Sequence, residues 1–349
     1  MTDTGHCPAS PRPGLPSPFA DGAALGIGSL PHLDAREAAE FAIGEFEIAT
    51  IPTLPARSPA ESMIAQAVVG LPGISIDQSG GITVEPERVS IGESTRIDLG
   101  HDAFVGFNSF LEHAKRTGLD GSPVKWQYVG PVTLGVALQR AGLDVATAFD
   151  AASATLRTQL ADISDAVAKA LPRSPQMVVL DEPWFADLMT PGFPIPPDEA
   201  IDRMSSAMAT LPSTSLVGIH CCAPCDVATL LASGPSVVSL PASPELVEWS
   251  GYLSRYLSDG GIIAWGVVPT DGPIPVTADR FWRALSDLWC TLVQRGCDPV
   301  MLRRNSIVTP HCGLAMHSES AARQVAQLTA EVAKRVKDQS TATRFALGA

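Results

Sequence analysis

Eight short apolar segments, most followed by a segment with helical periodicity, are the feature that most restricts how this chain can fold. The expected strands are 24–29, 47–52, 124–129, 177–180, 216–219, 236–240, 262–267 and 306–308. The expected helices between them include 35–45, 145–170, 201–209, 244–257 and 277–295. Strands that alternate with helices indicate a parallel sheet, and eight such units match a closed (β/α)8 TIM barrel of the α/β class. A doubly wound open sheet is the alternative, but no glycine-rich dinucleotide loop follows the first strand.

The expected barrel occupies residues 23–338, between two less ordered ends. Residues 1–22 contain five prolines among serine, glycine and aspartate, which predicts a disordered tail. Residues 339–349 are expected to fray. A long insertion follows the second strand, from about 54 to 122, and its two alternating runs around Gly80-Gly81 are typical of a hairpin. Loops this long in a barrel usually form lids or substrate walls.

The composition favours a soluble globular protein and argues against several kinds of partner. The 349 residues are 45% hydrophobic and 17% charged, which is enough for a large core. A net charge of -13 argues against nucleic acid or an anionic membrane surface as a partner. Seven cysteines without an apolar signal peptide predict reduced thiols in a cytoplasmic protein. No apolar stretch approaches the ~20 residues that a membrane helix requires.

Polar residues fall at or just after the ends of six expected strands. These positions are Gly28-Ser29, Gln127, Asp181-Glu182, His220-Cys222, Thr270-Asp271 and His311-Cys312. The carboxyl ends of the strands form the face of a barrel on which active sites are built. The pattern therefore predicts an enzyme with its site on that rim.

Two of these strand ends carry residues that suit a metal. His220 and Cys222 follow one strand, and Cys312 follows another about ninety residues later. Imidazole and thiolate together suit zinc, and a catalytic zinc has three protein ligands and one open position. The alternative is that these cysteines are buried free thiols that pack as small hydrophobic residues. The repeated pattern at two strand ends favours zinc.

Five short motifs, in the same order, resemble the catalytic barrel of cobalamin-independent methionine synthase. They are Ile27-Gly28-Ser29-Leu30-Pro31, Gly130-Pro131-Val132-Thr133, Leu180-Asp181-Glu182-Pro183, His220-Cys221-Cys222 and Pro310-His311-Cys312-Gly313-Leu314. The chain is more distantly similar to zinc methyltransferases acting on coenzyme M and to uroporphyrinogen decarboxylase. The resemblance, from about residue 25 to 336, implies a zinc-dependent methyltransferase of methionine biosynthesis that methylates a small thiol, homocysteine or similar.

The resemblance also implies roles for individual residues. His220, Cys222 and Cys312 would bind zinc, and the Ile27–Ser29 segment (Ile27, Gly28 and Ser29) would hold the carboxylate of the amino acid. Asp181 would bind its amine. We also expect substrate contacts from three further polar or aromatic residues on the rim, namely Gln127, Glu182 and Trp184.

The chain departs from the family pattern at the fourth zinc ligand. Pro241 stands where the family has a glutamate, and proline cannot bind a metal. Cys225 is a possible fourth ligand because it lies three residues after Cys222, a spacing that thiolate pairs use around zinc. Glu245, a water or the substrate thiolate are the other options.

Further departures concern proton transfer and the methyl donor. Asp271 stands where the family has its proton-shuttling histidine, so Asp271 or His311 is the expected general acid. No acid stands near Leu54, the place of a second amine-binding glutamate. Ala137 replaces a tryptophan that stacks on the pterin, and Trp126 and Trp184 are the remaining candidates for stacking.

The missing tryptophan, and the lack of the second barrel that full-length family members have, leave the donor open between methylfolate and methylcorrinoid. They favour a methylcorrinoid or another small donor over triglutamyl methyltetrahydrofolate. The other functions that stay open are an alkyl transferase for a different thiol and a zinc-binding barrel without turnover. A porphyrinogen decarboxylase is disfavoured because few arginines lie at the expected rim.

Overall fold

The computed structural model describes residues 19, 21–89 and 96–347, with side chains up to residue 339. Within this part of the chain, eight parallel strands form one sheet in the order β1-β10-β9-β8-β7-β6-β5-β2. The strands are β1 (Ala23–Ala24), β2 (Ala49–Thr50), β5 (Val124–Val129), β6 (Gln176–Asp181), β7 (Leu216–His220), β8 (Val237–Pro241), β9 (Ile262–Val268) and β10 (Ser306–Pro310). Parallel bridges Leu25–Ile48 and Ser29–Thr53 join the two ends of the sheet. The expected TIM-barrel fold class is confirmed.

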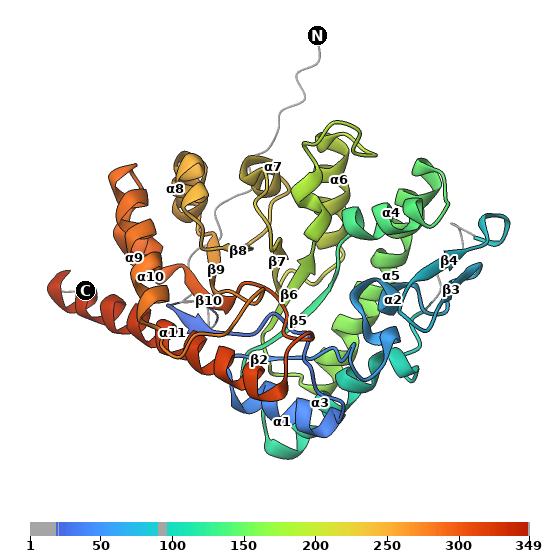
Figure 1. Ribbon diagram of the computed structural model, residues 1–349, viewed down its shortest axis with the longest axis horizontal. Helices are drawn as coiled ribbons and strands as arrows, with labels where there is room; N and C mark the ends of the chain where they lie inside the picture. Colours follow the sequence, from blue (N-terminus) through green and yellow to red (C-terminus); the bar gives the residue numbers. More distant parts are fainter. Residues whose placement is uncertain (1–18, 20, 90–95, 348–349) are drawn as a thin grey trace, which may run out of the picture.

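Helices follow the strands along the chain and surround the sheet (Figure 1). They are α1 (Ala35–Gly44), α2 (Met63–Val68), α3 (Val105–Thr117), α4 (Pro131–Arg140), α5 (Val145–Ala170), α6 (Pro197–Met208), α7 (Val227–Ala232), α8 (Ser250–Ser258), α9 (Asp279–Gln294), α10 (Pro299–Arg304) and α11 (Glu319–Leu347). Side-chain caps set several starts: Asp34 accepts from the Arg36 and Glu37 amides, and Asp144 accepts from the Thr147 amide. These polar caps explain why the expected helix boundaries at 35 and 145 agree with the structure.

Alternation along the strands divides the side chains between two cores. On β6, Val178 and Leu180 belong to the large core between the sheet and the helices, whereas Met177 and Val179 belong to a smaller core inside the barrel. The inner core is apolar, and Phe19 and Ile307 also pack there. Further along the strands, the inward positions are polar, as at Gln127 on β5 and Asp181 on β6. The apolar plug thus closes one end and leaves the polar groups toward the carboxyl ends.

The segment between β2 and β5 contains the expected hairpin. Strands β3 (Ile74–Ile76) and β4 (Ile82–Val84) pair antiparallel, and the hairpin lies at the periphery of the molecule beside α2 (Figure 1). The buried carboxylate of Glu61 accepts hydrogen bonds from the amides of Leu54 (2.9 Å) and Gly106 (3.3 Å), which fixes the start of the segment. Its role as a lid or substrate wall stays a prediction.

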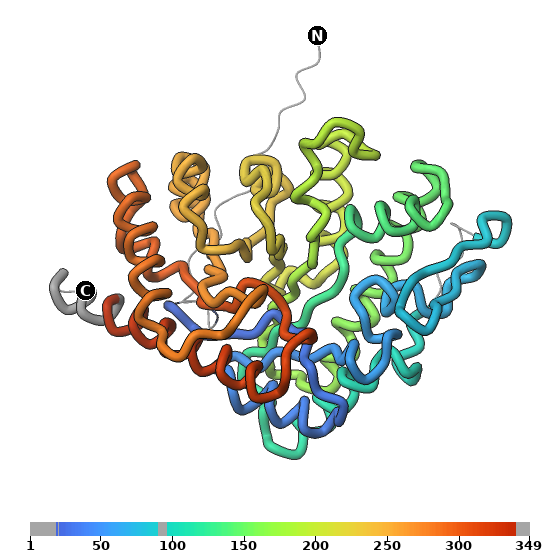
Figure 2. The backbone as a smooth tube through the Cα atoms, in the orientation of Figure 1, coloured from blue at the N-terminus to red at the C-terminus, as the bar shows by residue number. Residues whose placement is uncertain are grey.

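The first described residues lie beside the last strand, β10. The Gly22 amide donates to the Ser306 carbonyl at 2.7 Å, and Phe19 is buried, so barrel packing begins a few residues before the expected boundary. Figure 2 shows the first described residues, in blue, running next to the orange-red C-terminal part. Helix α11 continues to Leu347, beyond 339 where fraying was expected. The rest of the predicted tail, residues 1–18 and 20, lies outside the described residues.

Candidate functional site

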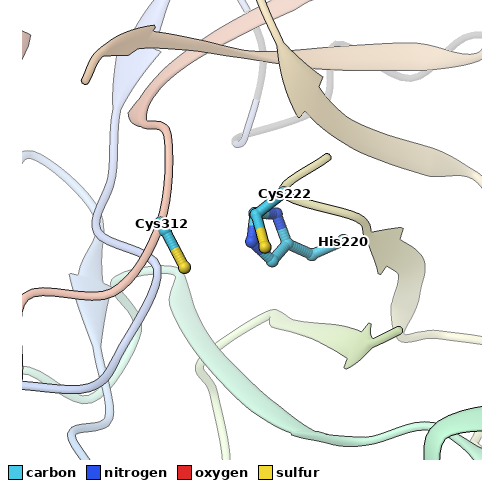
Figure 3. Close-up of side chains that lie close together, drawn as sticks. All are labelled: His220, Cys222 and Cys312. Atoms are coloured by element: carbon cyan, nitrogen blue, oxygen red, sulfur yellow. The ribbon is translucent and has the colours of Figure 1, made fainter. Parts of the chain in front are cut away.

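Three candidate metal ligands meet at the carboxyl ends of the strands, the rim that we call the mouth of the barrel. His220 is the last residue of β7, Cys222 lies two residues further, and Cys312 lies two residues after the end of β10. Their ligand atoms all lie within 4.8 Å of one another. Figure 3 shows the Cys312 sulfur directed across the mouth toward Cys222 and the His220 ring. The structure therefore brings together the three residues that the sequence singled out.

The His220 ring is oriented by a neighbour on the next strand. Its Nδ1 lies 2.9 Å from the Ser239 hydroxyl, and the two residues are partners in the β7–β8 register. Its Nε2 is buried and has no hydrogen-bond partner in the described structure. A metal-binding histidine commonly has one nitrogen held by a hydrogen bond and the other free for the metal. The arrangement fits a metal ligand.

The two thiols complete a donor set that suits zinc. A hydrogen bond between Cys222 and Cys312 lowers the pKa of Cys222 and raises the pKa of Cys312 to about 12. Both thiols are partly buried. One imidazole and two thiols match the three protein ligands of a catalytic zinc site, with one position left for substrate.

The options for a fourth protein ligand lie elsewhere. The Cys225 thiol is hydrogen-bonded to Cys221, which together with burial raises its pKa, and it is outside the group of three ligand atoms. Glu245 is exposed at the edge of a cavity of about 380 Å³ that Pro241 and Cys225 also line. Within the described residues, the structure groups three protein donors and no fourth.

The Ile27–Ser29 segment lies across the mouth from the β7 end and is tightly held. Gly28 has φ +143°, and a Cβ there would lie 2.0 Å from the Gln127 amide group, so only glycine fits. The Ser29 carbonyl accepts from the Leu314 amide at 2.8 Å. A Cβ on Gly313 would lie 1.9 Å from the Ser29 hydroxyl oxygen. The segment is therefore fixed between the third strand of the barrel and the loop that carries Cys312.

Asp181, the last residue of β6, lies next to the metal group. It is the register partner of His220, and its Oδ1 is buried without a hydrogen-bond partner in the described structure. Burial raises the pKa of Asp181, while the charges of His220 and Lys125 lower it. An unpaired buried carboxylate oxygen is costly, so a cationic partner such as a substrate amine would be favourable here.

The side chains of Glu182 and Gln127, which were expected to contact substrate, form hydrogen bonds within the protein. Glu182 is fully buried, and its oxygens accept hydrogen bonds from the amides of Val132 (2.9 Å) and Thr133 (2.7 Å) and from the Thr133 hydroxyl (2.6 Å). Its carboxylate therefore caps helix α4. Gln127 donates from Nε2 to the Ile51 carbonyl at 3.3 Å and packs on Gly28. Both side chains thus contact other parts of the protein and hold the surroundings of the site in place.

The aromatic candidates for stacking are largely occupied. The Arg140 guanidinium lies 4.2 Å from the centre of the Trp184 ring. Trp126 is 2% exposed, and its Nε1 donates to Gln176 at 2.9 Å, so it packs under the helices and cannot stack on a donor in the mouth. Ala137 is also buried, within α4. Trp184 keeps at most one face for a planar donor.

Asp271 and His311, the expected proton-transfer residues, lie near each other. Burial lowers the pKa of His311, and the charge of Asp271 partly offsets this effect. Asp271 is exposed on the loop after β9. His317 Nε2 lies 2.9 Å from the Thr270 carbonyl and so holds that loop against the start of α11. The loop that carries Asp271 is therefore fixed near His311.

Sequence reasoning missed two polar residues that support this site, Ser239 and Lys125. Each is buried within a strand and flanked by apolar residues. Period-two alternation places Ser239 on the face of β8 that looks into the barrel, and Lys125 on the same face of β5 as Gln127. A polar residue at an inward position was the signal that could have revealed them.

The fold and the site define a (β/α)8 barrel with a candidate His-Cys-Cys metal centre at the carboxyl ends of its strands. No protein-family model and no curated protein matches the chain. In the part of the chain that the structure describes, no helix combines the length and apolarity needed to cross a membrane.

Among the solved structures that are similar to this chain, two are described as B12-independent methionine synthases. One, from Shewanella sp. W3-18-1 in complex with selenomethionine, has a TM-score of 0.57 and 14% identity over 93% of this chain and 99% of that chain. The other, assigned to this function in Listeria monocytogenes, has a TM-score of 0.50 and 13% identity over 87% of this chain and 85% of that chain. At these identities the likeness establishes the fold, and the resemblance expected from the motifs is confirmed at that level.

Proposed function

We propose that this protein is a zinc-dependent methyltransferase that transfers a methyl group to the thiol of a small amino acid, homocysteine or a close analogue. The observation that carries the proposal is the group of His220, Cys222 and Cys312, with their ligand atoms within 4.8 Å, at the mouth of the barrel. The similar Shewanella structure was solved with selenomethionine, the selenium analogue of such a product.

The three ligands would hold zinc and leave one position for the substrate sulfur. When bound, zinc would act as a Lewis acid that lowers the pKa of the substrate thiol, so that the thiolate can attack a methyl group. Ser239 would keep the His220 ring in the tautomer that leaves Nε2 free.

The surrounding residues would bind the rest of the amino acid. The Ile27–Ser29 segment would hold the carboxylate, and the unpaired Oδ1 of Asp181 would accept a hydrogen bond from the amine. Two opposite charges on the substrate would thus meet two different parts of the mouth. The thiol would then point toward the metal group. Holding the reacting atoms in this geometry lowers the barrier to reaction.

Transfer of a methyl group from nitrogen to sulfur requires a proton for the departing amine. His311 would donate this proton in its imidazolium form, which the charge of Asp271 favours, and would take up a new proton from solvent afterwards. The thiol proton leaves to bulk solvent, so the overall proton count balances. Of the two residues expected as general acid, Asp271 or His311, we thus assign the acid to His311 and a supporting role to Asp271.

For the donor we propose a methylated reduced folate. The similar structures are described as B12-independent, so they give no support to the methylcorrinoid that the sequence favoured. The similarity covers 99% of the Shewanella chain, so it extends over the whole of a protein of that description. The part of the Trp184 ring that Arg140 and the core leave exposed would be the stacking surface for a pterin.

Metal analysis and a methylation assay test the proposal together. The wild-type protein, purified in reducing buffer that contains zinc, should hold one zinc per chain and form methionine from homocysteine and methyltetrahydrofolate. Cys222→Ser and Cys312→Ser should each lose the zinc and the activity, whereas Cys290→Ser, an exposed thiol on α9, should retain both.

The outcomes separate the competing functions. Zinc binding without turnover of methyltetrahydrofolate or methylcobalamin would indicate a barrel that binds metal without catalysis. Turnover with methylcobalamin alone would overturn the choice of donor. A wild-type protein that cannot bind zinc at all would contradict the proposal as a whole.

A further inference from the structure

A buried lysine lies next to the Ile27–Ser29 segment. Lys125 on β5 is 1% exposed, and among the described residues no other lysine and no arginine is buried. Its Nζ donates hydrogen bonds to the Ile27 carbonyl and, at 3.0 Å, to Gln127 Oε1. A charge buried this deeply is costly unless it is paired or serves a function. The lysine therefore invites a functional explanation.

The contact with Ile27 fixes the direction of the next amide. The peptide group between Ile27 and Gly28 is planar and trans, so its carbonyl and its N–H point in opposite directions. Because the Ile27 carbonyl is directed at Lys125 Nζ, the Gly28 N–H is directed away from Lys125. Neither the Gly28 nor the Ser29 N–H has a hydrogen-bond partner in the described structure. Both N–H groups are therefore free to donate a hydrogen bond to a bound anion.

Hydrogen bonds to Thr53 also fix the Ile27–Ser29 segment, so its peptide groups cannot rotate freely. The Gly28 carbonyl accepts from the Thr53 amide at 3.2 Å, and the Leu30 amide donates to the Thr53 carbonyl at 2.9 Å. The Gln127 side chain, itself held by Lys125, packs directly against Gly28. Lys125 thus holds the segment in two ways: it donates directly to the Ile27 carbonyl, and it fixes the Gln127 side chain that packs on Gly28.

We propose that Lys125 is a positioning residue: it holds the Ile27–Gly28 peptide so that two free amides face the carboxylate of the substrate, and its buried charge favours that anion. The assignment of the anion as an amino-acid carboxylate rests on the proposed function. Burial lowers the pKa of Lys125 to about 8, and nearby Asp181 offsets part of this effect, so the ammonium form prevails at neutral pH. The interior thus presents a cation below an otherwise uncharged pair of amides.

Equilibrium binding of a product-like ligand tests this role without requiring turnover. The ligands are L-methionine and 3-(methylthio)propylamine, which keeps the amine and the thioether but lacks the carboxylate. The variants are Lys125→Met, which removes the charge at similar volume, and Met177→Leu as a control. Met177 is the register partner of Lys125 on β6 and lies in the inner core, so it reports any general effect of altering the interior.

Wild type should bind methionine more tightly than the amine, because charge-assisted hydrogen bonds stabilise the carboxylate. Lys125→Met should weaken methionine binding by about 10- to 100-fold, the loss expected for hydrogen bonds to a charged group. Binding of the amine should change by less than about 3-fold, since its contacts do not involve the two amides. Met177→Leu should leave the ratio of the two affinities at the wild-type value, and zinc content should be equal in all three proteins.

Several results would overturn the proposal. Equal affinity of the wild type for both ligands would do so even if Lys125→Met failed to fold. A Lys125→Met protein that weakens both ligands equally would point to a merely structural lysine. Loss of methyl transfer in a wild type that still discriminates by the carboxylate would instead count against the proposed function alone.

Discussion

At the scale of single residues, the metal group depends on a neighbour that binds no metal. The Ser239 hydroxyl lies 2.9 Å from His220 Nδ1, and the other ring nitrogen is left free. The imidazole can bind a metal only through a nitrogen without a proton, so the partner of Nδ1 decides which nitrogen is available. Ser239 therefore determines how well His220 can act as a ligand.

Substitution Ser239→Ala should weaken zinc binding by about 10-fold or more, as loss of an orienting partner typically does. Competition with a chelator of known affinity would measure the change. Ser233→Ala is a matched control, because Ser233 is equally buried but donates to the Leu230 carbonyl at the end of α7. Equal zinc affinity of wild type and Ser239→Ala would show that the contact does not matter for the metal.

A second prediction concerns Gly313, which follows the ligand Cys312. An alanine Cβ there would lie 1.9 Å from the Ser29 hydroxyl oxygen, so Ser29 must move and the amides beside it must follow. We expect Gly313→Ala to weaken methionine binding by about 10-fold, a loss of roughly 1.4 kcal/mol, measured by calorimetry. Gly251→Ala on α8 has open space around its Cβ and should bind like wild type. If Gly313→Ala binds methionine as tightly as wild type, the Ile27–Ser29 segment is not part of the substrate site.

At the scale of elements, a buried carboxylate holds helix α4 to the end of β6. Glu182 accepts three hydrogen bonds from Val132 and Thr133, in the first turn of the helix. A side-chain oxygen at a helix N-terminus accepts hydrogen bonds from amides that have no partner within the helix. The Gly-Pro-Val-Thr and Asp-Glu-Pro motifs thus act as two halves of one cap, which explains why both occur in the same chain.

Glu182→Gln should destabilise the fold by on the order of 1–3 kcal/mol, because its amide group would face an N–H donor. Burial raises the pKa of Glu182 from 4.5 to about 7, so the folded protein retains a proton that the unfolded chain releases. The contribution of this group to stability therefore falls as pH rises from about 4.5 to about 7. The difference in the free energy of unfolding between wild type and Glu182→Gln should therefore decrease between about pH 4.5 and about pH 7.

Urea denaturation at several pH values would measure this gap. The control is Glu248→Gln at an exposed glutamate, which should change stability by less than about 0.5 kcal/mol at every pH. A gap that widens as pH rises would mean that the buried carboxylate is ionised throughout and stabilised by its three donors.

At the scale of the whole molecule, the barrel has a core that does not depend on the metal. The inner plug and the outer layer are both apolar, and the candidate ligands lie beyond the plug at the rim. Removal of zinc with a chelator should leave the circular dichroism spectrum unchanged and lower Tm by no more than about 10 °C. Cooperative unfolding on removal of the metal would show instead that the site holds the barrel together.

The net charge of the whole protein, -13, affects how it binds a negatively charged methyl donor. A negatively charged protein offers no long-range attraction for a polyglutamate tail. The KM for triglutamyl methyltetrahydrofolate should therefore be no lower than the KM for the monoglutamate, and it should fall as salt rises from about 0.01 M to about 0.2 M. A lower KM for the triglutamate at low salt would reveal a local basic surface that outweighs the overall charge.

The sequence by itself determined the barrel and most of its strand positions. Apolar runs and helical periodicity are local patterns, and they gave β5 and α5 at the observed residues. The rule that parallel strands end on one rim was enough to place His220, Cys222 and Cys312 on the same face. A local pattern combined with one topological rule therefore predicted the candidate metal group.

Only the tertiary structure decided which polar residues face substrate and which support the site. Glu182 and Asp181 are neighbours in sequence, but one caps α4 whereas the other has an unpaired oxygen beside His220. Cys225 has a favourable spacing from Cys222 but its thiol meets Cys221 instead. These differences depend on side-chain direction and on partners distant in sequence, such as Ser239 for His220. Spacing along the chain carries no information about either.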